Sequence, residues 1–333
     1  MSCWYKDYDA LGGIVISSRI RLARNLSNMP FPRRMDAQML RTLKERVKVA
    51  VDKMQDKVML KFIEMNDIPE NEIKAMVERH VISPDFANSC RDRAIALSND
   101  ENISIMIGEE DHIRIQVISA GNSLDKAYEI ADMIDVALNE SLGFAFDSKL
   151  GYLTECPTNI GTGLRASLML HLPVCESRGE INMISDAASK IGLTVRGMYG
   201  EGSKASASFY QISNQITLGI SEKNAIENLK VIAQQIVERE KSARADIDKL
   251  NLMDTVFRSL GALKYARIMS SDEFTKHISM IKLGVDEGII ENNNIKPVEL
   301  LISAQPYMLM KNHIAITPLE RDEARATMIR GLL

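Results

Sequence analysis

The sequence predicts an α+β fold in its first part, followed by a separate all-helical domain. Short apolar runs typical of strands recur between residues 14 and 219, with helical segments among them. After about residue 250 the strand signals fade, and successive segments have the Ser, Asp or Pro starts and Gly ends of helices. We therefore expect two domains, at 1–247 and 248–333.

The first strand and helix carry clear signals. Residues 14–26 begin with a β-branched apolar run and continue through Arg19 and Arg21, which would point to one side of an extended segment. Asp36 is a candidate N-cap for a helix. The apolar positions of that helix have helical spacing: Met39, Leu40, Leu43, Val47 and Val51.

The middle of the chain contains both strand-like and helix-like segments in alternation. Asn99-Asp100 is a turn signal between two strand-like runs. Residues 193–219 resemble two strands around a Gly/Ser-rich loop, and residues 222–245 carry a helical apolar stripe. The other expected elements are strands at 58–65, 94–100, 103–110 and 112–119, and helices at 69–83 and 123–141. In the C-terminal part, helices are expected at 252–269, 271–288, 296–310 and 318–333.

Composition excludes several classes of protein. The 333 residues are 45% hydrophobic and 26% charged with a net charge of −4, so bulk basic character does not recruit nucleic acid. No apolar run approaches the ~18–20 residues of a membrane span. The N-terminus lacks the basic and apolar regions of a signal peptide. The four cysteines form no CxxC pair. We expect a cytoplasmic protein without a membrane or a direct nucleic-acid partner.

Five arginines lie beside strand signals and glycines. They are Arg19, Arg21, Arg114, Arg165 and Arg196. The guanidinium fork suits phosphate oxygens, so the set suggests an anion site, although each residue alone is typical of a surface. Arginines are also dense between residues 19 and 34, but no aromatic platform for nucleic-acid bases accompanies them.

Two further stretches carry chemistry. GEEDHIR (108–114) places adjacent carboxylates after an apolar run, which indicates a cation or proton transfer, or else a polar hairpin turn. CPTNIGTGLRA (156–166) is neither a P-loop nor GxGxxG, but its Gly-x-Gly turn can present N–H groups to an anion. Cys156 has no adjacent histidine and is either a site thiol or a structural cysteine. His80 and His171 fit core or edge positions better than ligand positions.

Taken together and in this order, SSRIRLARN, EEDHIRIQ, CPTNIGTGLRASLMLHLP and RGMYGEGS…FYQISNQITLG resemble the ATP:guanido phosphotransferases, the creatine and arginine kinase family. The resemblance covers residues 14–245 and implies an antiparallel sheet flanked by helices. RDEARA (321–326) is similar to a motif of the bacterial protein-arginine kinases within that family. Only thirteen residues precede Ile14, where the small-molecule kinases have a helical domain, so we expect an open active site.

The resemblance implies a role for each matching residue. Arg19, Arg21, Arg114, Arg165 and Arg196 would grip the ATP phosphates. Glu110 and Glu201 would orient the guanidinium, Glu110 would accept its proton, and Cys156 would tune the electrostatics beside it without forming a covalent bond. Arg321, Asp322 and Arg325 would bind phosphoarginine away from the active site. ATP and Mg²⁺ are the implied cofactors, with the metal held mainly by ATP.

Two positions depart from the family pattern. Gly108 stands where the family usually has asparagine, which would loosen the loop carrying Glu110. Met169 stands where several creatine kinases have a histidine near the adenine, so recognition of the base is left open.

The implied activity is transfer of the ATP γ-phosphate to arginine side chains of proteins, marking them for a Clp-type protease and regulating a stress-response repressor. An activator protein and a homodimer or higher oligomer built on the C-terminal domain are further expectations. The alternatives are a kinase for free arginine and an inactive scaffold that binds phosphoarginine. The short N-terminus and RDEARA argue against the first, and only Gly108 favours the second.

Overall fold

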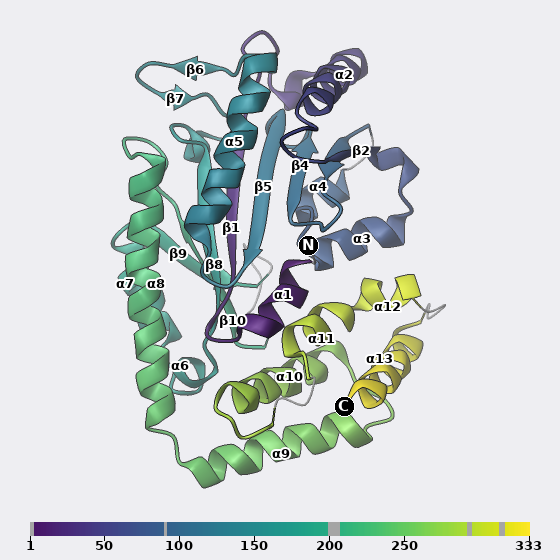
Figure 1. Ribbon diagram of the computed structural model, residues 1–333, viewed down its shortest axis with the longest axis vertical. Helices are drawn as coiled ribbons and strands as arrows, with labels where there is room; N and C mark the ends of the chain where they lie inside the picture. Colours follow the sequence, from purple (N-terminus) through teal and green to yellow (C-terminus); the bar gives the residue numbers. More distant parts are fainter. Residues whose placement is uncertain (1–2, 90–91, 199–206, 292–294, 313–316) are drawn as a thin grey trace.

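The computed structural model describes residues 3–89, 92–198, 207–291, 295–312 and 317–333. Its centre is an eight-stranded sheet in the order β2-β3-β4-β5-β1-β8-β10-β9, antiparallel throughout (Figure 1). The strands are β1 (Val15–Arg24), β2 (Lys61–Glu64), β3 (Ala94–Leu97), β4 (Ile103–Ile107), β5 (Ile113–Ala120), β8 (Leu164–His171), β9 (Leu193–Gly197) and β10 (Phe209–Asn214). The α+β class and the antiparallel sheet are confirmed.

Strand alternation gives the sheet an apolar and a polar face. Ile20 and Leu22 of β1 lie on the face that forms the main core. Arg19 and Arg21 point the other way, as their spacing predicts. Because β1 lies between β5 and β8, the polar residues of three strands gather on one face.

Long helices cover the apolar face. Figure 1 shows α5 (Leu124–Leu142) and α8 (Glu222–Ala245) crossing it, with α2 (Ala37–Lys53) beside them. The Asp36 side chain accepts a hydrogen bond from Met39 N at the start of α2, so the expected N-cap is confirmed.

Shorter elements border the sheet. They are α3 (Glu70–Glu78), α4 (Pro84–Asn88), α6 (Pro173–Ser177), α7 (Ile181–Ser189), the hairpin strands β6 (Phe146–Asp147) and β7 (Gly151–Tyr152), and 3-10 turns at Pro32–Arg34, Met65–Asp67 and Pro157–Asn159. The helix expected at 69–83 ends early, because His80 adopts a left-handed φ of 63° that a helix cannot continue through.

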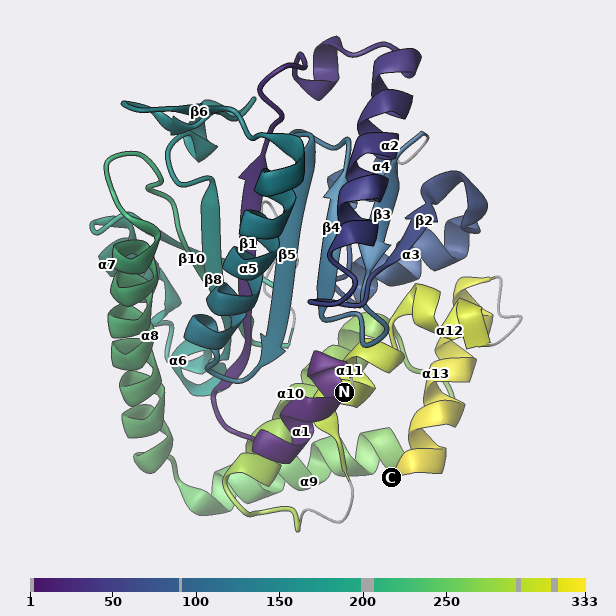
Figure 2. The same ribbon diagram turned by 45° about the horizontal axis from the view of Figure 1, so that its top comes forward.

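The C-terminal helices gather at one end of the sheet (Figure 2). They are α9 (Lys249–Tyr265), α10 (Ser271–Asp286), α11 (Pro297–Ser303), α12 (Pro306–Asn312) and α13 (Pro318–Leu332). The single helix expected at 296–310 is wrong, because Pro306 starts a second helix. The N-terminal helix α1 (Trp4–Leu11), which the sequence analysis did not identify, packs against α11. We propose the domain boundary at 247/248, between α8 and α9.

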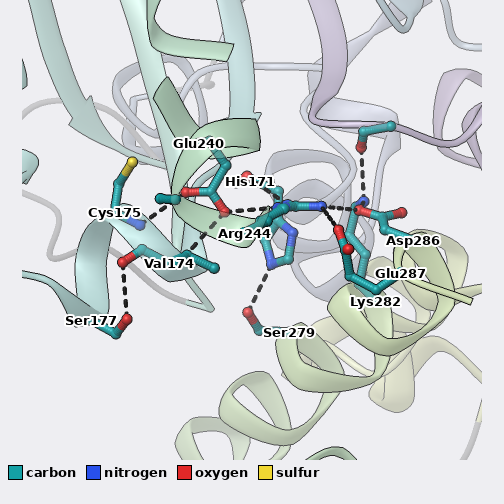
Figure 3. Close-up of polar contacts among 12 residues, drawn as sticks. His171, Val174, Cys175, Ser177, Glu240, Arg244, Ser279, Lys282, Asp286 and Glu287 are labelled. Carbon is teal, nitrogen blue, oxygen red and sulfur yellow. Dashed lines mark hydrogen bonds and ion pairs between the residues drawn. The ribbon is translucent and has the colours of Figure 1, made fainter. Parts of the chain in front are cut away.

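A buried ion network joins α8 to α10 (Figure 3). Arg244 Nε lies 2.9 Å from Glu240 Oε1, and Arg244 Nη1 lies 3.1 Å from Asp286 Oδ2. Lys282 Nζ lies 2.7 Å from the same Asp286 oxygen. At the end of β8, His171 Nε2 lies 2.8 Å from Ser279 Oγ of α10, so His171 is a core residue, as expected. These contacts hold the C-terminal helices against the sheet.

In the part of the chain that the structure describes, no helix is both long enough and apolar enough to cross a membrane.

Candidate active site

A cavity of about 340 Å³ opens on the polar face of the sheet. It brings together seven of the residues singled out from the sequence: Arg19, Arg21, Arg114, Arg165, Arg196, Glu110 and Cys156. These residues come from four strands and two loops that are far apart in the sequence.

Strand register explains how the arginines meet. Arg21 of β1 lies opposite Arg165 of β8, and it lies opposite Gln116 of β5 on its other side. Arg114 is two residues from Gln116 on the same face of β5. Arg196 of β9 lies opposite Gln211 of β10, and the Gln211 Oε1 atom accepts a hydrogen bond of 2.8 Å from Arg19.

Repulsion between guanidinium groups affects two of the arginines that line the cavity. Burial first, and then repulsion from Arg165 and Arg114, lower the pKa of Arg19 to about 10. Burial first, and then repulsion from Arg19, Arg114 and Arg165, hold the pKa of Arg21 well below its ordinary value, although Glu109 opposes this. Arg21 Nε has no hydrogen-bond partner among the described residues. Buried like charges repel, so the cavity is built for a multiply charged anion.

One acidic side chain lies behind the arginines. Glu109 Oε1 accepts hydrogen bonds from Arg114 Nη1 at 2.8 Å and from Ser83 Oγ at 2.7 Å. Glu109 is buried, and its Oε2 atom has no partner among the described residues.

The loop that carries Glu110 is held firmly. Gly108 has a φ of 81°, and its N–H donates to His112 O at 3.0 Å. A Cβ at Gly108 would lie 2.7 Å from Leu40 Cδ1, so the glycine also permits close packing on α2. Asn25 accepts from His112 N at 2.9 Å and donates to Asp111 Oδ1 at 2.7 Å. These contacts define the position of the loop, and its loosening by Gly108 stays a prediction.

Glu110 itself is exposed to solvent at the cavity. Its Oε1 atom accepts a hydrogen bond of 3.1 Å from Asn159 Nδ2, which belongs to the CPTNIGTG stretch. Partial burial raises the pKa of the Glu110 carboxyl; Arg114 opposes this, and the negative charges of Asp111, Glu109 and Glu155 add to it. A carboxylate with a raised pKa is a better proton acceptor.

The CPTNIGTG stretch forms a tight wall of the cavity. Cys156, Thr158 and Asn159 line it, and Cys156 Sγ lies 3.1 Å from Thr158 Oγ1. Gly161 has a φ of 113°, and a Cβ there would overlap the carbonyl oxygen of Thr217. The glycine therefore lets the loop after β10 pack directly behind this wall.

Sequence analysis missed several residues that line the cavity. His80 lies there, although it was expected only in a core or edge position; burial first, and then Arg19, lower its pKa to about 3, so its imidazole is neutral. Its ring is 5.8 Å from that of Trp4 in α1. Gln116, Gln211, Ser83 and Asp85 also line the cavity. No local motif marks these residues, because long-range packing brings them there.

The other four expected site residues are not among the described residues that line the cavity. Glu201 falls outside the described residues. Arg321, Asp322 and Arg325 belong to α13, among the C-terminal helices. Arg325 is buried and donates to the carbonyl oxygens of Ala304 at 2.9 Å and Met269 at 2.8 Å, and it pairs with Asp322 at 2.6 Å. In this structure its guanidinium therefore holds α13 in place. Met169 is buried in the core cluster that includes Phe209.

Among the described residues, no group of three or more His, Cys, Asp or Glu side chains is arranged to hold a metal directly. Two buried carboxylate oxygens, Glu109 Oε2 and Asp111 Oδ2, lack hydrogen-bond partners there. Such oxygens suit the water ligands of Mg²⁺, which keeps several waters when it is bound through phosphates. The donor set therefore fits a nucleotide-borne magnesium.

Comparison with known proteins identifies the class. The model of the ATP:guanido phosphotransferase C-terminal catalytic domain matches residues 42–243. Among solved structures, lombricine kinase has a TM-score of 0.62 at 23% identity, covering 71% of this chain and 68% of that one. The taurocyamine kinase of Schistosoma mansoni with bound transition-state analogue components has a TM-score of 0.63 at 22% identity, covering 84% and 40%. At these identities, the two structures establish the fold alone.

The relatives narrow the class further. The model of the protein-arginine kinase McsB C-terminal domain matches residues 249–333. The protein-arginine kinase of Halothermothrix orenii is 45% identical, covering 100% of this chain and 97% of its own. That of Brevibacillus brevis is 44% identical, covering 100% and 95%. The chain belongs to the ATP:guanido phosphotransferases and, within them, to the protein-arginine kinase family.

Proposed function

We propose that this chain transfers the γ-phosphate of ATP to arginine side chains of proteins. The observation that carries the proposal is the cavity that joins five arginines to a proton-accepting carboxylate, in a chain related over its full length to protein-arginine kinases. The enzyme is an ATP-dependent kinase of the guanidino-acceptor type.

The five arginines would hold the phosphates of ATP. Their mutual repulsion is relieved when the polyphosphate supplies negative charge. Guanidinium groups that are already in position then stabilise the negative charge that spreads over the transferring phosphoryl group. The side chains therefore need to move little during the reaction.

Glu110 would activate the acceptor. A guanidinium is protonated at neutral pH, so one of its nitrogens becomes nucleophilic only as a proton leaves. That nitrogen forms a bond to the γ-phosphorus while the bond to the β–γ bridging oxygen breaks; ADP departs with the electron pair, and the proton passes to Glu110. Cys156 would lie beside the guanidinium, and we propose Glu201 as a second orienting carboxylate.

Magnesium would be bound chiefly by ATP, with Glu109 and Asp111 accepting hydrogen bonds from its water ligands. The ion supplies charge neutralisation on the phosphates when it is bound.

The wider biology is proposed on the strength of the family. Its elements are a cytoplasmic location, an activator protein, delivery of marked proteins to a Clp-type protease, and regulation of a stress-response repressor. Arg321 and Asp322, which are partly exposed, would receive phosphoarginine, with Arg325 beneath them.

We also propose a homodimer or higher oligomer made through α9. Three large apolar side chains, Leu250, Met253 and Phe257, stand at helical spacing along this helix and are exposed. A monomeric mass in light scattering would refute this proposal.

Acceptor competition tests the proposed function. The purified chain would be incubated with Mg-ATP and equal arginine concentrations supplied as the free amino acid and as an unfolded protein. Acid-labile, base-stable phosphate is expected on the protein, and Glu110→Ala should abolish it. Label mainly on free arginine would instead make the chain a small-molecule kinase. Absence of label on both, with phosphoarginine still bound, would favour a scaffold, unless adding cell extract restored labelling.

A further inference from the structure

One segment of the chain both lines the cavity and borders the contact with the C-terminal helices. Residues 77–85 run from the end of α3 to the start of α4. Helix α12 lies against α3 (Figure 2). The C-terminal helices therefore contact the element from which this part of the cavity wall begins. The segment supplies six residues of the lining: Val77, His80, Ile82, Ser83, Pro84 and Asp85.

Glu78 makes the buried polar contact between α3 and α12. Its carboxylate accepts hydrogen bonds from the first two N–H groups of α12, because Pro306 has none. Tyr307 N lies 3.0 Å from both Oε1 and Oε2, and Met308 N lies 2.8 Å from Oε2. The first N–H groups of a helix lack partners within the helix, so a carboxylate there stabilises the helix start. Glu78 thus fastens the end of α3 to the start of α12.

Arg325 of α13 fixes the start of α12 from another direction. Arg325 Nε donates to Ala304 O at 2.9 Å, two residues before α12 begins. Burial raises the pKa of Glu78 to about 7; the two N–H groups, and then the charges of Arg325 and Arg79, oppose this rise. The Arg325 guanidinium therefore acts on the Glu78 carboxyl as well as on the backbone before α12. The start of α12 links α13 to α3.

The turn after Glu78 depends on how its two sides are held. His80, two residues on, has a left-handed φ of 63°, which a residue with a Cβ adopts only where its surroundings hold it. Between them, Arg79 Nη1 lies 3.4 Å from Met308 Sδ of α12. Gln116 of β5 donates to His80 O at 2.8 Å. The turn is therefore held by α12 on one side and by the sheet on the other.

Beyond the turn, the segment supports one of the arginines of the cavity. Ser83 Oγ donates to Glu109 Oε1 at 2.7 Å, and the same oxygen accepts from Arg114 Nη1 at 2.8 Å. A shift of the segment would move Ser83 and change the position of Glu109. The Arg114 guanidinium would then lose the alignment that the buried carboxylate gives it.

We propose that Glu78 is a positioning residue for ATP binding, because it holds the cavity wall at residues 77–85 in place by fastening α3 to α12. This inference rests on the proposed function, in which the cavity receives the phosphates of ATP. Glu78 is not among the described residues that line the cavity, and neither is any described residue of the C-terminal helices. Glu78 acts through His80 and Ser83, and the C-terminal helices contribute to nucleotide affinity from outside the cavity.

Calorimetric titration of the full chain with Mg-ATP, without an acceptor, tests the proposal. Glu78→Ala removes the contact and should raise the Kd about tenfold. Glu78→Gln keeps one oxygen that can accept from both N–H groups, and its Kd should stay within about twofold of the wild-type value. Glu78→Asp withdraws the carboxylate by one methylene, so its Kd should lie between those of Glu78→Gln and Glu78→Ala.

Asp9 offers a matched control, because it makes the same kind of contact elsewhere. This carboxylate of α1 accepts from Val298 N at 3.2 Å and from Glu299 N at 2.9 Å, at the start of α11. Asp9 is not among the described residues that line the cavity. Asp9→Ala should therefore leave the Kd for Mg-ATP unchanged while it loosens the C-terminal helices.

Urea unfolding of each variant separates positioning from folding. Unfolding raises an apparent Kd only in inverse proportion to the folded fraction, so a variant that is about nine-tenths folded cannot owe a tenfold change to it. An unchanged Kd in Glu78→Ala, an equal rise in Asp9→Ala, or a rise in Glu78→Gln as large as that in Glu78→Ala would overturn the positioning role and leave the proposed function intact. If Glu78→Ala does not fold, an unchanged Kd in Glu78→Asp has the same meaning. Failure of the wild type to bind Mg-ATP would overturn the proposed function and this inference with it.

Discussion

At the scale of single residues, the chemistry depends on how the Glu110 carboxylate is held. Asn159 donates to it from the CPTNIGTG wall, and burial first, with neighbouring acidic groups adding to it, raises the pKa of Glu110. The carboxylate is the form that accepts a proton. Activity should therefore be lost as the pH falls through the pKa of Glu110, and any change that raises this pKa moves the loss to higher pH.

Two substitutions of Asn159 should distinguish the effect on the position of the Glu110 carboxylate from the effect on its pKa. Asn159→Ala removes the hydrogen bond, and kcat should fall about 10- to 100-fold because the base is misplaced. Asn159→Asp adds negative charge beside Glu110, and the acid limb of the kcat–pH profile should move to higher pH. The measurement is the pH profile of both variants. An acid limb that is unchanged in Asn159→Asp would show that Glu110 is not the titrating base.

Arg21 illustrates a conflict between stability and function. Its charge is repelled by the neighbouring arginines Arg19, Arg114 and Arg165. Arg21→Met should lower kcat/KM by about a thousandfold. It should also raise the thermal midpoint in the absence of ATP, because repulsion from the neighbouring arginines is removed. Arg41→Met, on the exposed side of α2, should change neither quantity. A lower midpoint in Arg21→Met would refute the repulsion argument.

The arginines of the cavity could be predicted because they stand beside strand and glycine signals. His80 and Gln211 could not, because nothing in their local sequence indicates that α3 and β10 meet Arg19. The RDEARA motif likewise could not reveal that Arg325 is enclosed by carbonyl oxygens.

At the scale of elements, the glycine-containing wall positions Cys156 and Asn159. Its packing depends on Gly161, which faces the backbone of Thr217 without room for a side chain. The sequence indicated a turn that presents N–H groups to an anion. That role stays a prediction, whereas the structure shows that the loop after β10 packs behind this turn.

Gly161→Ala should therefore damage catalysis more than folding. The φ of 113° is strained for alanine, which costs about 1–3 kcal/mol, and the added methyl must displace Thr217. We expect a fall in kcat of about a hundredfold. Gly179→Ala is the matched control, since its φ is 72° but its surroundings are open. Steady-state kinetics and urea unfolding measure both effects, and equal activity in the two variants would contradict this role of Gly161.

Most strands and long helices could be predicted from the spacing of their apolar residues and from helix-capping residues, because one face of each element is buried. The exceptions have physical causes. Helix α1 is short and is stabilised by packing on the C-terminal helices, whereas the segment expected as one helix at 296–310 is divided by Pro306.

At the scale of the whole molecule, the Arg244 network fastens the C-terminal helices to the sheet (Figure 3). Arg244→Ala would leave Glu240 and Asp286 with a missing buried partner, and we expect a loss of about 3–5 kcal/mol in the free energy of unfolding. Arg258→Ala removes an exposed pair with Asp254 and should leave stability unchanged. Urea unfolding measures both, and equal stabilities would show that the network does not fasten the two parts.

The central claim is that the cavity phosphorylates arginine in proteins. The most direct test incubates the wild-type chain and Glu110→Gln with Mg-ATP and an unfolded protein, then locates phosphate by mass spectrometry that preserves phosphorus–nitrogen bonds. We predict phosphoarginine with the wild type and none with Glu110→Gln, although the variant still binds ATP. Phosphate on other residue types only, or undiminished phosphoarginine with Glu110→Gln, would contradict the claim.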